Sequence, residues 1–351
     1  MNSAADRGGR STARHARQER FAPIGADGQA RIAGSSVLIV GLGALGTHVA
    51  EALARAGVGR LALVDRDVVE LQNLQRQTLY DASDAALGRP KAIAAAARIA
   101  AIDPAILVTP FAADFDGELW DRLPARPDVV VDGTDNFATR MLINDLAVRD
   151  GVPWVYGGVV GASGRVAVVL PGVTPCLRCL LENEGDGRAI LTCETAGVIE
   201  PAVAWVAALQ TAETLKLLLG ARDALARGVA RIDAWTGVLQ RAFVEAKPRA
   251  ECASCGKRHF PALTVTKRGT TALCGRDAVQ VRPQVTRHAD LSSLAGALRG
   301  AADALEVSDA FLRFTGDGCR FTVFADGRAL VFGTSDPLRA RALYDRWIGL
   351  P

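Results

Sequence analysis

Apolar residues in the first 150 positions of the chain follow two alternating periods. Short apolar runs predict buried strands at 36–40, 61–64, 107–111 and 129–132. Segments with helical spacing separate them, at about 45–56, from Pro90 to just before Pro104, and at 137–150. This alternation predicts an α/β fold: a doubly wound, Rossmann-like arrangement around a mainly parallel sheet.

The pattern changes after residue 151. Two strand-like runs, 154–158 and 165–170, flank a Gly-Ala-Ser-Gly turn, which predicts an antiparallel hairpin. A long helix is expected at 201–219, followed by strands at 230–235 (ARIDAW) and 241–246 (RAFVEA). We therefore expect antiparallel strands to continue the parallel sheet.

A smaller unit is predicted at the C-terminal end of the chain. Its strand-like segments are separated by Asp-Gly pairs at 317–318 and 326–327, which favour tight hairpins, and a helix is expected at about 336–348. We expect three parts: a flexible tail at 1–13, a large α/β domain at 14–258 and a small α+β C-terminal domain at 262–351.

Composition excludes several classes of protein. Of 351 residues, 49% are hydrophobic, which is too many for a disordered chain. The net charge of +3 (41 basic minus 38 acidic residues) is too small to suggest a nucleic-acid binder. No apolar run reaches the ~18 residues of a membrane span, and the first residues lack the apolar segment of a secretory signal. We therefore expect a cytoplasmic protein with no nucleic-acid or membrane partner.

A glycine-rich turn follows the first predicted strand. Gly41, Gly43 and Gly46 match the pattern G-x-G-x-x-G between a strand and a helix, where backbone N–H groups can bind phosphate. Asp65 ends the next strand, where an acid can accept hydrogen bonds from ribose hydroxyls. These features alone indicate a nucleotide site, for which an NAD dehydrogenase is the default; a turn without a ligand is the other interpretation.

Charged residues beyond the second strand argue against hydride transfer. Acids, amides and Arg76 crowd the segment from Asp65 to Gln77, and Lys91 lies in the first turn of a helix. A cation in the first turn of a helix is unfavourable because of the helix dipole, so a bound polyanion would explain the position of Lys91. Two such cations suit a triphosphate better than a dinucleotide. A solvated basic surface is the alternative for either cation taken alone.

Polar residues also follow the fourth strand, in the segment Asp132-Gly133-Thr134-Asp135-Asn136. Ligands of open α/β sheets bind beyond the carboxyl ends of the strands, and a carboxylate there can hold Mg²⁺. In the alternative interpretation, Asp135 or Asn136 caps the next helix and Asp132 is a structural acid of the loop.

Four of the seven cysteines form two C-x-x-C pairs, Cys176 with Cys179 and Cys252 with Cys255. Two such pairs suit a structural, tetrahedral Zn²⁺ site, and a redox pair is the alternative. The pairs lie so far apart in sequence that only the fold can bring them together. Cys193 lies in a polar, glycine-containing loop and is either a buried apolar residue or an exposed nucleophile.

Taken together, these motifs resemble those of the ThiF/MoeB/HesA adenylyltransferases, bacterial relatives of ubiquitin-activating enzymes. The resemblance covers about residues 14–256 and rests on GLGALG, DRDVVELQNLQRQ, GRPK, DGTDN, LTCETAGV and the two cysteine pairs. Ala44 departs from the pattern, since many members have glycine there.

The resemblance implies ATP-dependent, Mg²⁺-assisted adenylation of the C-terminal Gly-Gly carboxylate of a ubiquitin-like sulfur carrier protein. It assigns nucleotide binding to residues of the motifs: Gly41, Gly43, Gly46, Asp65, Asp67, Asn73, Arg76, Lys91, Asp135 and Asn136. Arg76 and Asp135 also count as catalytic, and Cys193 matches a cysteine that in some members accepts the carrier or its sulfur. The four paired cysteines would hold Zn²⁺.

The segment RHARQ at 14–18 resembles an N-terminal motif whose second arginine reaches the partner subunit's active site. That implies a homodimer in which Arg17 acts in trans. Without the resemblance, a disordered basic tail would be preferred. A sulfur donor, such as a cysteine desulfurase, is a further implied partner.

The C-terminal extension resembles the tail of thiamine-pathway members, which favours the carrier of thiazole synthesis (ThiS-like) over the molybdopterin carrier (MoaD-like). Two rival functions come from other classes. An NAD-dependent oxidoreductase would leave Arg76, Lys91 and Asp135 unexplained, and a non-catalytic partner subunit would not need to keep this charged set.

Overall fold

The structure, a computed structural model, describes residues 13–182, 197–242, 248–264, 270–272, 277–283, 289–308 and 311–349. Contacts divide the chain into two compact units, residues 1–264 and 265–351. The domain limits proposed from the sequence, 258 and 262, lie close to this division.

The first unit contains one eight-stranded sheet in the order β3-β2-β1-β4-β5-β6-β7-β8. Its strands are β1 (Ser36–Val40), β2 (Arg60–Val64), β3 (Leu107–Phe111), β4 (Val129–Asp132), β5 (Trp154–Val160), β6 (Ser163–Val169), β7 (Val229–Asp233) and β8 (Val238–Ala242). Strands β3 to β5 pair in parallel, and β5 to β8 are antiparallel. The predicted Rossmann-like sheet with an antiparallel continuation is therefore confirmed.

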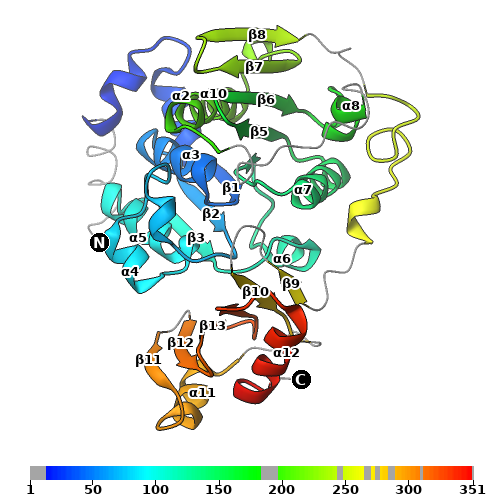
Figure 1. The fold of residues 1–351 in the computed structure, drawn as a ribbon. Helices are drawn as coiled ribbons and strands as arrows, with labels where there is room; N and C mark the ends of the chain where they lie inside the picture. Colours follow the sequence, from blue (N-terminus) through cyan, green and yellow to red (C-terminus); the bar gives the residue numbers. More distant parts are fainter. Residues whose placement is uncertain are drawn as a thin grey trace. The chain divides into compact units, whose positions relative to one another are not determined.

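Helices cover both faces of this sheet (Figure 1). On one face lie α2 (Gly25–Gly34), α3 (Ala44–Arg55), α5 (Lys91–Ile102) and α10 (Glu200–Leu219). On the other lie α6 (Gly117–Arg122), α7 (Phe137–Asp150) and α8 (Leu177–Glu182). Strand β1 shows why: Val37 and Ile39 point into the first core, whereas Leu38 and Val40 point into the second. A strand buried on both faces reads as the continuous apolar run SVLIV.

Most predicted elements of this unit are confirmed, and the differences are local. The sequence analysis did not predict the short helices α2, α4 (Ala82–Leu87), α6 and α8, because helices of six to ten residues carry little periodic signal. Strand β8 begins at Val238, three residues before the predicted start. Helix α10 is long and apolar enough to cross a membrane by length and composition, but it packs against α3, β5 and β6 as a core helix.

The second unit contains an antiparallel sheet in the order β11-β12-β13-β14-β10-β9. Its strands are β9 (Thr270–Ala272), β10 (Ala278–Val281), β11 (Asp303–Val307), β12 (Phe311–Gly316), β13 (Cys319–Phe324) and β14 (Ala329–Phe332). Both Asp-Gly pairs form the expected hairpin turns, and Asp317 and Gly318 adopt the positive φ values (50° and 72°) that such a turn requires. Helices α11 (Leu291–Leu298) and α12 (Pro337–Trp347) share a hydrophobic core with one face of the sheet.

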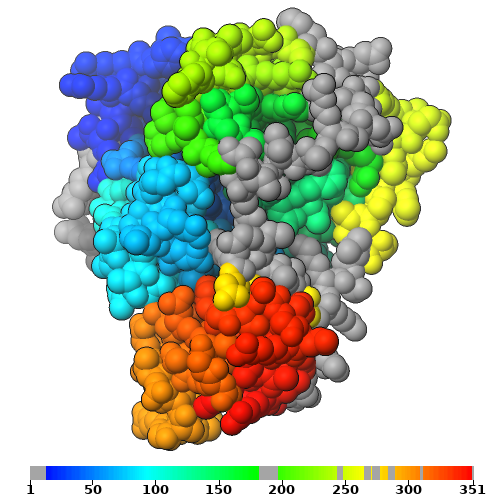
Figure 2. Space-filling model, viewed as in Figure 1, coloured from blue at the N-terminus to red at the C-terminus, as the bar shows by residue number. Residues whose placement is uncertain are grey.

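The description of the N-terminal segment begins at residue 13, so the flexible tail expected at 1–13 lies, except for its last residue, outside the described residues. Residues 13–19 form a helix, which lies at the edge of the first unit and is part of the dark blue region in Figure 2. His15 is buried, Gln18 donates a hydrogen bond to the carbonyl of Ala56 (2.9 Å), and Arg14 donates one to the carbonyl of Ile102 (2.7 Å). The interpretation of residues 13–19 as a disordered basic tail is therefore wrong, because the two hydrogen bonds attach this helix to the C-terminal ends of α3 and α5.

Candidate functional site

The glycine-rich turn crosses the loop that follows β4. Strand order reverses between β1 and β4, and ligands of open α/β sheets bind in the crevice at such a point. A Cβ atom on Gly41 (φ 86°) would lie 2.8 Å from the carbonyl carbon of Gly133, and one on Gly133 would meet the carbonyl oxygen of Gly41. The two backbones are thus in direct contact, which leaves no room for side chains. Ala44, the departure from the family pattern, begins α3 and is not among the described residues with positive φ.

Asp65 fastens the glycine-rich turn to the end of β2. One carboxylate oxygen accepts the N–H of Leu42 (2.6 Å) and the other accepts the N–H of Asp67 (2.7 Å). Burial raises the pKa of Asp65, the positive charge of Lys91 lowers it, and the charge of Asp67 raises it. The carboxylate therefore sits at the crevice in a network that already fixes its orientation.

Lys91 begins α5 and is 4% exposed. Its Nζ lies 3.7 Å from a carboxylate oxygen of Asp67, so it is not part of a solvated basic surface. Tyr80, which the sequence analysis missed, donates its hydroxyl proton to the carbonyl of Leu42 (2.8 Å) and lies 3.3 Å from the carbonyl of Lys91. It links the glycine-rich turn to the N-terminus of α5, and only the fold reveals this because residue 80 carries no motif.

The segment Leu71–Asn73 forms a short 3-10 helix with a reciprocal cap. Asn73 is buried, and its side-chain oxygen accepts the N–H of Glu70 (3.0 Å). Arg76, which is half-buried, donates to the carbonyl of Gln72 (3.0 Å). Asn73 therefore shapes this loop, while Arg76 keeps part of its guanidinium exposed.

Asp132, which ends β4, and Asp135 and Asn136, which follow it, have different surroundings. Asp132 is fully buried and accepts bonds from the N–H and hydroxyl of Thr134 (2.9 and 2.7 Å) and from Nε of Arg140 (3.2 Å). Burial raises its pKa, and Arg140 and Thr134 lower it. Asn136 caps α7 by accepting the N–H of Thr139 (3.1 Å). Asp135 lies between them and is exposed, so it is the carboxylate of this loop that a ligand could reach.

The four paired cysteines meet in space although 72 residues separate the pairs (252 − 179 − 1). Their Sγ atoms all lie within 4.8 Å of one another, with distances of 3.9 Å (Cys176–Cys179), 3.6 Å (Cys176–Cys252) and 3.4 Å (Cys179–Cys255). A tetrahedral metal with bonds of about 2.3 Å to sulfur implies S–S separations of about 3.8 Å. The donor set therefore fits a metal ion.

Metal binding also accounts for the charge state that such a cluster needs. Burial, together with the neighbouring cysteines, raises the pKa of Cys176 to about 12 in the absence of a metal. Four thiolates could not share this buried space without a cation.

A buried carboxylate ties the cysteine cluster to α7. Asp145 is fully buried and accepts hydrogen bonds from the hydroxyl of Ser254 and the N–H of Ala262 (2.9 Å). Arg178 lies 3.5 Å from it and also donates to Ser254 (2.9 Å). Both cysteine pairs are thus held against one helix through side chains that no motif marks.

Two predicted site residues stand apart from these clusters. Arg17 is exposed on the N-terminal helix, where it is free of the packing that buries His15. Cys193 lies outside the residues that the structure describes.

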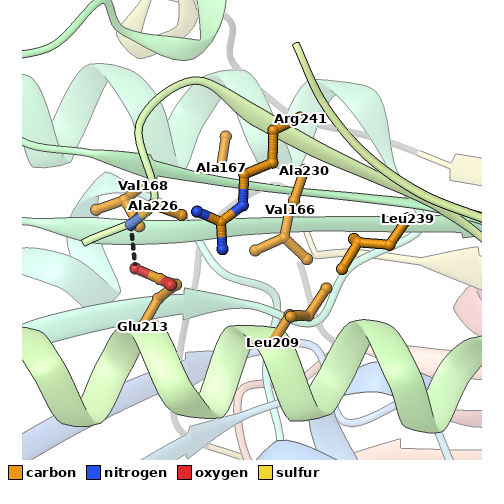
Figure 3. A pocket seen from close by; sticks show the side chains of 9 residues that line it. All are labelled: Val166, Ala167, Val168, Leu209, Glu213, Ala226, Ala230, Leu239 and Arg241. Carbon is orange, nitrogen blue, oxygen red and sulfur yellow. Dashed lines mark hydrogen bonds between the residues drawn. The ribbon is translucent and has the colours of Figure 1, made fainter. Parts of the chain in front are cut away.

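A separate pocket lies between α10 and the antiparallel strands β6 to β8 (Figure 3). Glu213 is its buried acid, and Arg241 reaches into it from β8. The carboxylate of Glu213 already accepts the N–H of Ala226 (2.9 Å) and a bond from Lys216 (2.6 Å). None of the motif residues lines this pocket, so we assign it no chemistry.

Comparisons with known proteins place the chain among adenylyltransferases. Residues 15–254 match the ThiF family. The "Sulfur carrier protein ThiS adenylyltransferase" of Bacillus subtilis (strain 168) is 42% identical over 339 residues, which cover 96% of this chain and 100% of that protein. The "Molybdopterin-synthase adenylyltransferase" of Escherichia coli (strain K12) is 38% identical, over 66% of this chain and 91% of that protein. A crystal structure of E. coli MccB with succinimide shares the fold, with a TM-score of 0.58 at 23% identity over 69% of this chain and 74% of MccB.

Proposed function

Because the chain belongs to the ThiF family, we propose that it adenylates the C-terminal glycine carboxylate of a ThiS-like sulfur carrier protein with ATP, releasing pyrophosphate. It is a nucleotidyltransferase. The observation that carries the choice of carrier is the match to a ThiS adenylyltransferase along that protein's whole length. The relative named for molybdopterin synthase matches only 66% of this chain, so a MoaD-like carrier is the second candidate.

The reaction needs positioning and charge neutralisation rather than a general base. A carboxylate is already a nucleophile, and it attacks the α-phosphorus while pyrophosphate leaves in line. We propose that the glycine-rich turn and the N-terminus of α3 receive the phosphates, together with Asn73 and the cations Arg76 and Lys91. Asp65 would hold the ribose, and Asp67 would line the same nucleotide site. The burial of Lys91 supports its assignment to the phosphates, since a desolvated cation acts on phosphate at low dielectric.

Asp135 would hold Mg²⁺, with Asn136 beside it on the cap of α7. When bound, the ion would neutralise charge on the phosphates. The exposure of Asp135 supports this assignment, and the internal saturation of Asp132 leaves Asp135 as the accessible carboxylate of the loop.

For the cysteine cluster we propose structural Zn²⁺. Four sulfur donors, mostly buried, in two C-x-x-C pairs match a closed tetrahedral site. A redox function suits the arrangement less well, because the Sγ atoms of both cysteine pairs lie together in one cluster of four, as metal ligands do.

The remaining proposals concern partners. A homodimer would let the exposed Arg17 reach the crevice of the opposite subunit. A sulfur donor such as a cysteine desulfurase would act after adenylation, and Cys193 would accept the carrier or its sulfur. We place the protein in the cytoplasm, with no nucleic-acid or membrane partner.

A subunit-mixing experiment tests the role of Arg17. Arg17→Ala and Asp135→Ala chains are each expected to be nearly inactive. If Arg17 acts in trans, mixed dimers contain one intact site and activity returns; if it acts in its own chain, every site lacks one group and activity stays lost.

The overall function is tested by incubating the protein with ATP, Mg²⁺ and a panel of purified sulfur carriers. We expect carrier-dependent exchange of labelled pyrophosphate into ATP, and a mass increase of one AMP on a ThiS-like carrier. An NAD-dependent reaction without pyrophosphate exchange would contradict the assignment. Adenylation of a MoaD-like carrier alone would select the second candidate.

A further inference from the structure

Arg140, on the first turn of α7, contacts both sides of the crevice loop. Its Nε atom lies 3.2 Å from a carboxylate oxygen of the buried Asp132, and its Nη2 atom donates to the carbonyl of Thr134. The same nitrogen lies 3.3 Å from the carbonyl of Gly157 on β5. One guanidinium therefore ties the end of β4, the residue immediately before Asp135 and the neighbouring strand together.

Strand β5 is built to admit this side chain. The guanidinium stacks over the ring of Tyr156, 5.4 Å from its centre. A Cβ atom on Gly158 would lie 2.8 Å from the hydroxyl of Tyr156 and 3.7 Å from Nη2 of Arg140. Glycine at position 158 therefore leaves space for the side chains of Tyr156 and Arg140. This explains one of the two glycines in β5, since glycine is unfavourable inside a strand.

The second glycine, Gly157, faces the opposite side of β5. A Cβ atom there would overlap the side-chain amide of Gln210, from α10. Gln210 is fully buried and donates to the carbonyl of Asp132 (2.8 Å). Arg140 and Gln210 thus make hydrogen bonds to residues 132–134 from opposite faces of the sheet.

We propose that Arg140 is a positioning residue for adenylation: by holding Asp132 and the carbonyl of Thr134, it fixes where the adjacent Asp135 carboxylate stands in the crevice. This rests on the proposed function, in which the Asp135 carboxylate would hold Mg²⁺. A guanidinium can bind three acceptors in one plane, whereas a lysine ammonium at the same place is a single point charge. Arg140→Lys therefore preserves charge and removes the geometry.

The chain offers a matched control in Arg126. This arginine also stacks over an aromatic ring (Trp120, 5.1 Å), donates to a backbone carbonyl, and pairs with carboxylates of Asp121 and Asp150 (3.0 Å each). Asp150 is the last residue of α7, and Arg140 lies in the first turn of the same helix. The two arginines therefore make their contacts at opposite ends of α7. Arg126→Lys removes the same kinds of contact away from the crevice.

The experiment measures carrier-adenylate formation for wild type, Arg140→Lys and Arg126→Lys. We expect Arg140→Lys to lower kcat between about tenfold and a hundredfold, because small misplacement of a catalytic group costs this much, while the KM for ATP changes less than about twofold. Hydrogen exchange should rise in the peptide spanning 132–136 in Arg140→Lys only. Arg126→Lys should keep the wild-type kcat.

A double mutant separates positioning from a general structural effect. If Arg140 acts through Asp135, Arg140→Lys has little further effect on kcat in an Asp135→Asn background. Multiplicative losses, or equal behaviour of the two lysine variants, would overturn the proposal while leaving the proposed function intact. An inactive wild type would instead remove the proposed function itself.

Discussion

The crevice and the cysteine cluster are both built around α7, yet they use polar groups in opposite ways. Asp135, just before this helix, is exposed, and Arg76, in the loop that follows the 3-10 helix Leu71–Asn73, is half-buried, so part of each side chain is accessible. Farther along the helix Asp145 is fully buried and bonded to Ser254 and Ala262. Asp135 and Arg76 therefore remain accessible to a ligand, whereas Asp145 has its hydrogen bonds satisfied inside the fold.

The contrast also holds within the crevice, between two carboxylates three residues apart. Asp132 is buried, and its carboxylate oxygens accept hydrogen bonds from Thr134 and Arg140, whereas Asp135 is exposed. The comparison therefore predicts that changes at the cysteine cluster reduce stability first, and that changes at the exposed crevice groups reduce activity alone.

The largest expected effect is loss of the metal site. Cys252→Ser removes one of four donors from a site that, in small zinc domains, contributes on the order of 10 kcal/mol of apparent binding energy. We expect substoichiometric zinc by elemental analysis, a fall in the melting temperature and loss of activity as a consequence. Cys319→Ser, which changes a buried cysteine in the second unit, is the control and should keep full zinc content. If freshly purified wild-type protein contained no zinc and its melting temperature did not change with a chelator, the comparison would fail.

The next effect concerns Asp135. Asp135→Asn keeps the size and removes the charge of an exposed side chain, so the melting temperature should stay within about 2 °C of wild type. Loss of a charge contact made in the transition state costs about 3 kcal/mol, which corresponds to roughly a hundredfold lower kcat. Pyrophosphate exchange at saturating ATP is the measurement.

The matching change at Asp132 sharpens this result. Asp132→Asn leaves Arg140 without its buried carboxylate partner and should lower the free energy of unfolding as well as the rate. If both variants lost only activity, or both lost only stability, the distinction between the two carboxylates would fail.

The smallest effect is expected at the far end of α7. Asp150 accepts bonds from Arg149 (2.7 Å) and Trp120 (2.7 Å), and these, with the charges of Arg149 and Arg126, lower its pKa to about 2. A carboxylate whose pKa is lower in the folded state stabilises the fold above its unfolded pKa of about 3.9, and the contribution disappears as the pH falls towards 2. Asp150→Asn should therefore cost about 1–2 kcal/mol at pH 7, after discounting for partial exposure.

Urea unfolding at several pH values measures this contribution. The gap between wild type and Asp150→Asn should narrow between pH 5 and pH 3, and adenylation at pH 7 should be unchanged. A gap that is constant with pH would show that the variant acts through packing and not through charge.

Much of the fold follows from local sequence. The apolar runs and their separating helices predict the order of strands along the chain, because a buried parallel strand needs a continuous apolar segment and its crossover helix needs a helical period. The glycine pattern and the lysine at the start of α5 likewise predict a phosphate site, and this stays a prediction, because in the structure Gly41 contacts the backbone of Gly133 and Lys91 lies 3.7 Å from Asp67. Motifs also marked the cysteine pairs, which the fold brings together, and Arg17 and Asp135, whose roles stay predictions.

Contacts between distant segments were decided only by the tertiary structure. The sequence could not say which of Asp132 and Asp135 is exposed, because that depends on Arg140 and on the space left by Gly158 on another strand. Nor could it find Tyr80 or Asp145, whose partners are 38 and up to 117 residues away. Local spacing determines helices, strands and ligand motifs, whereas burial and hydrogen-bond partners arise from packing between elements. That packing is what separates the buried carboxylates of Asp132 and Asp145 from the exposed carboxylate of Asp135.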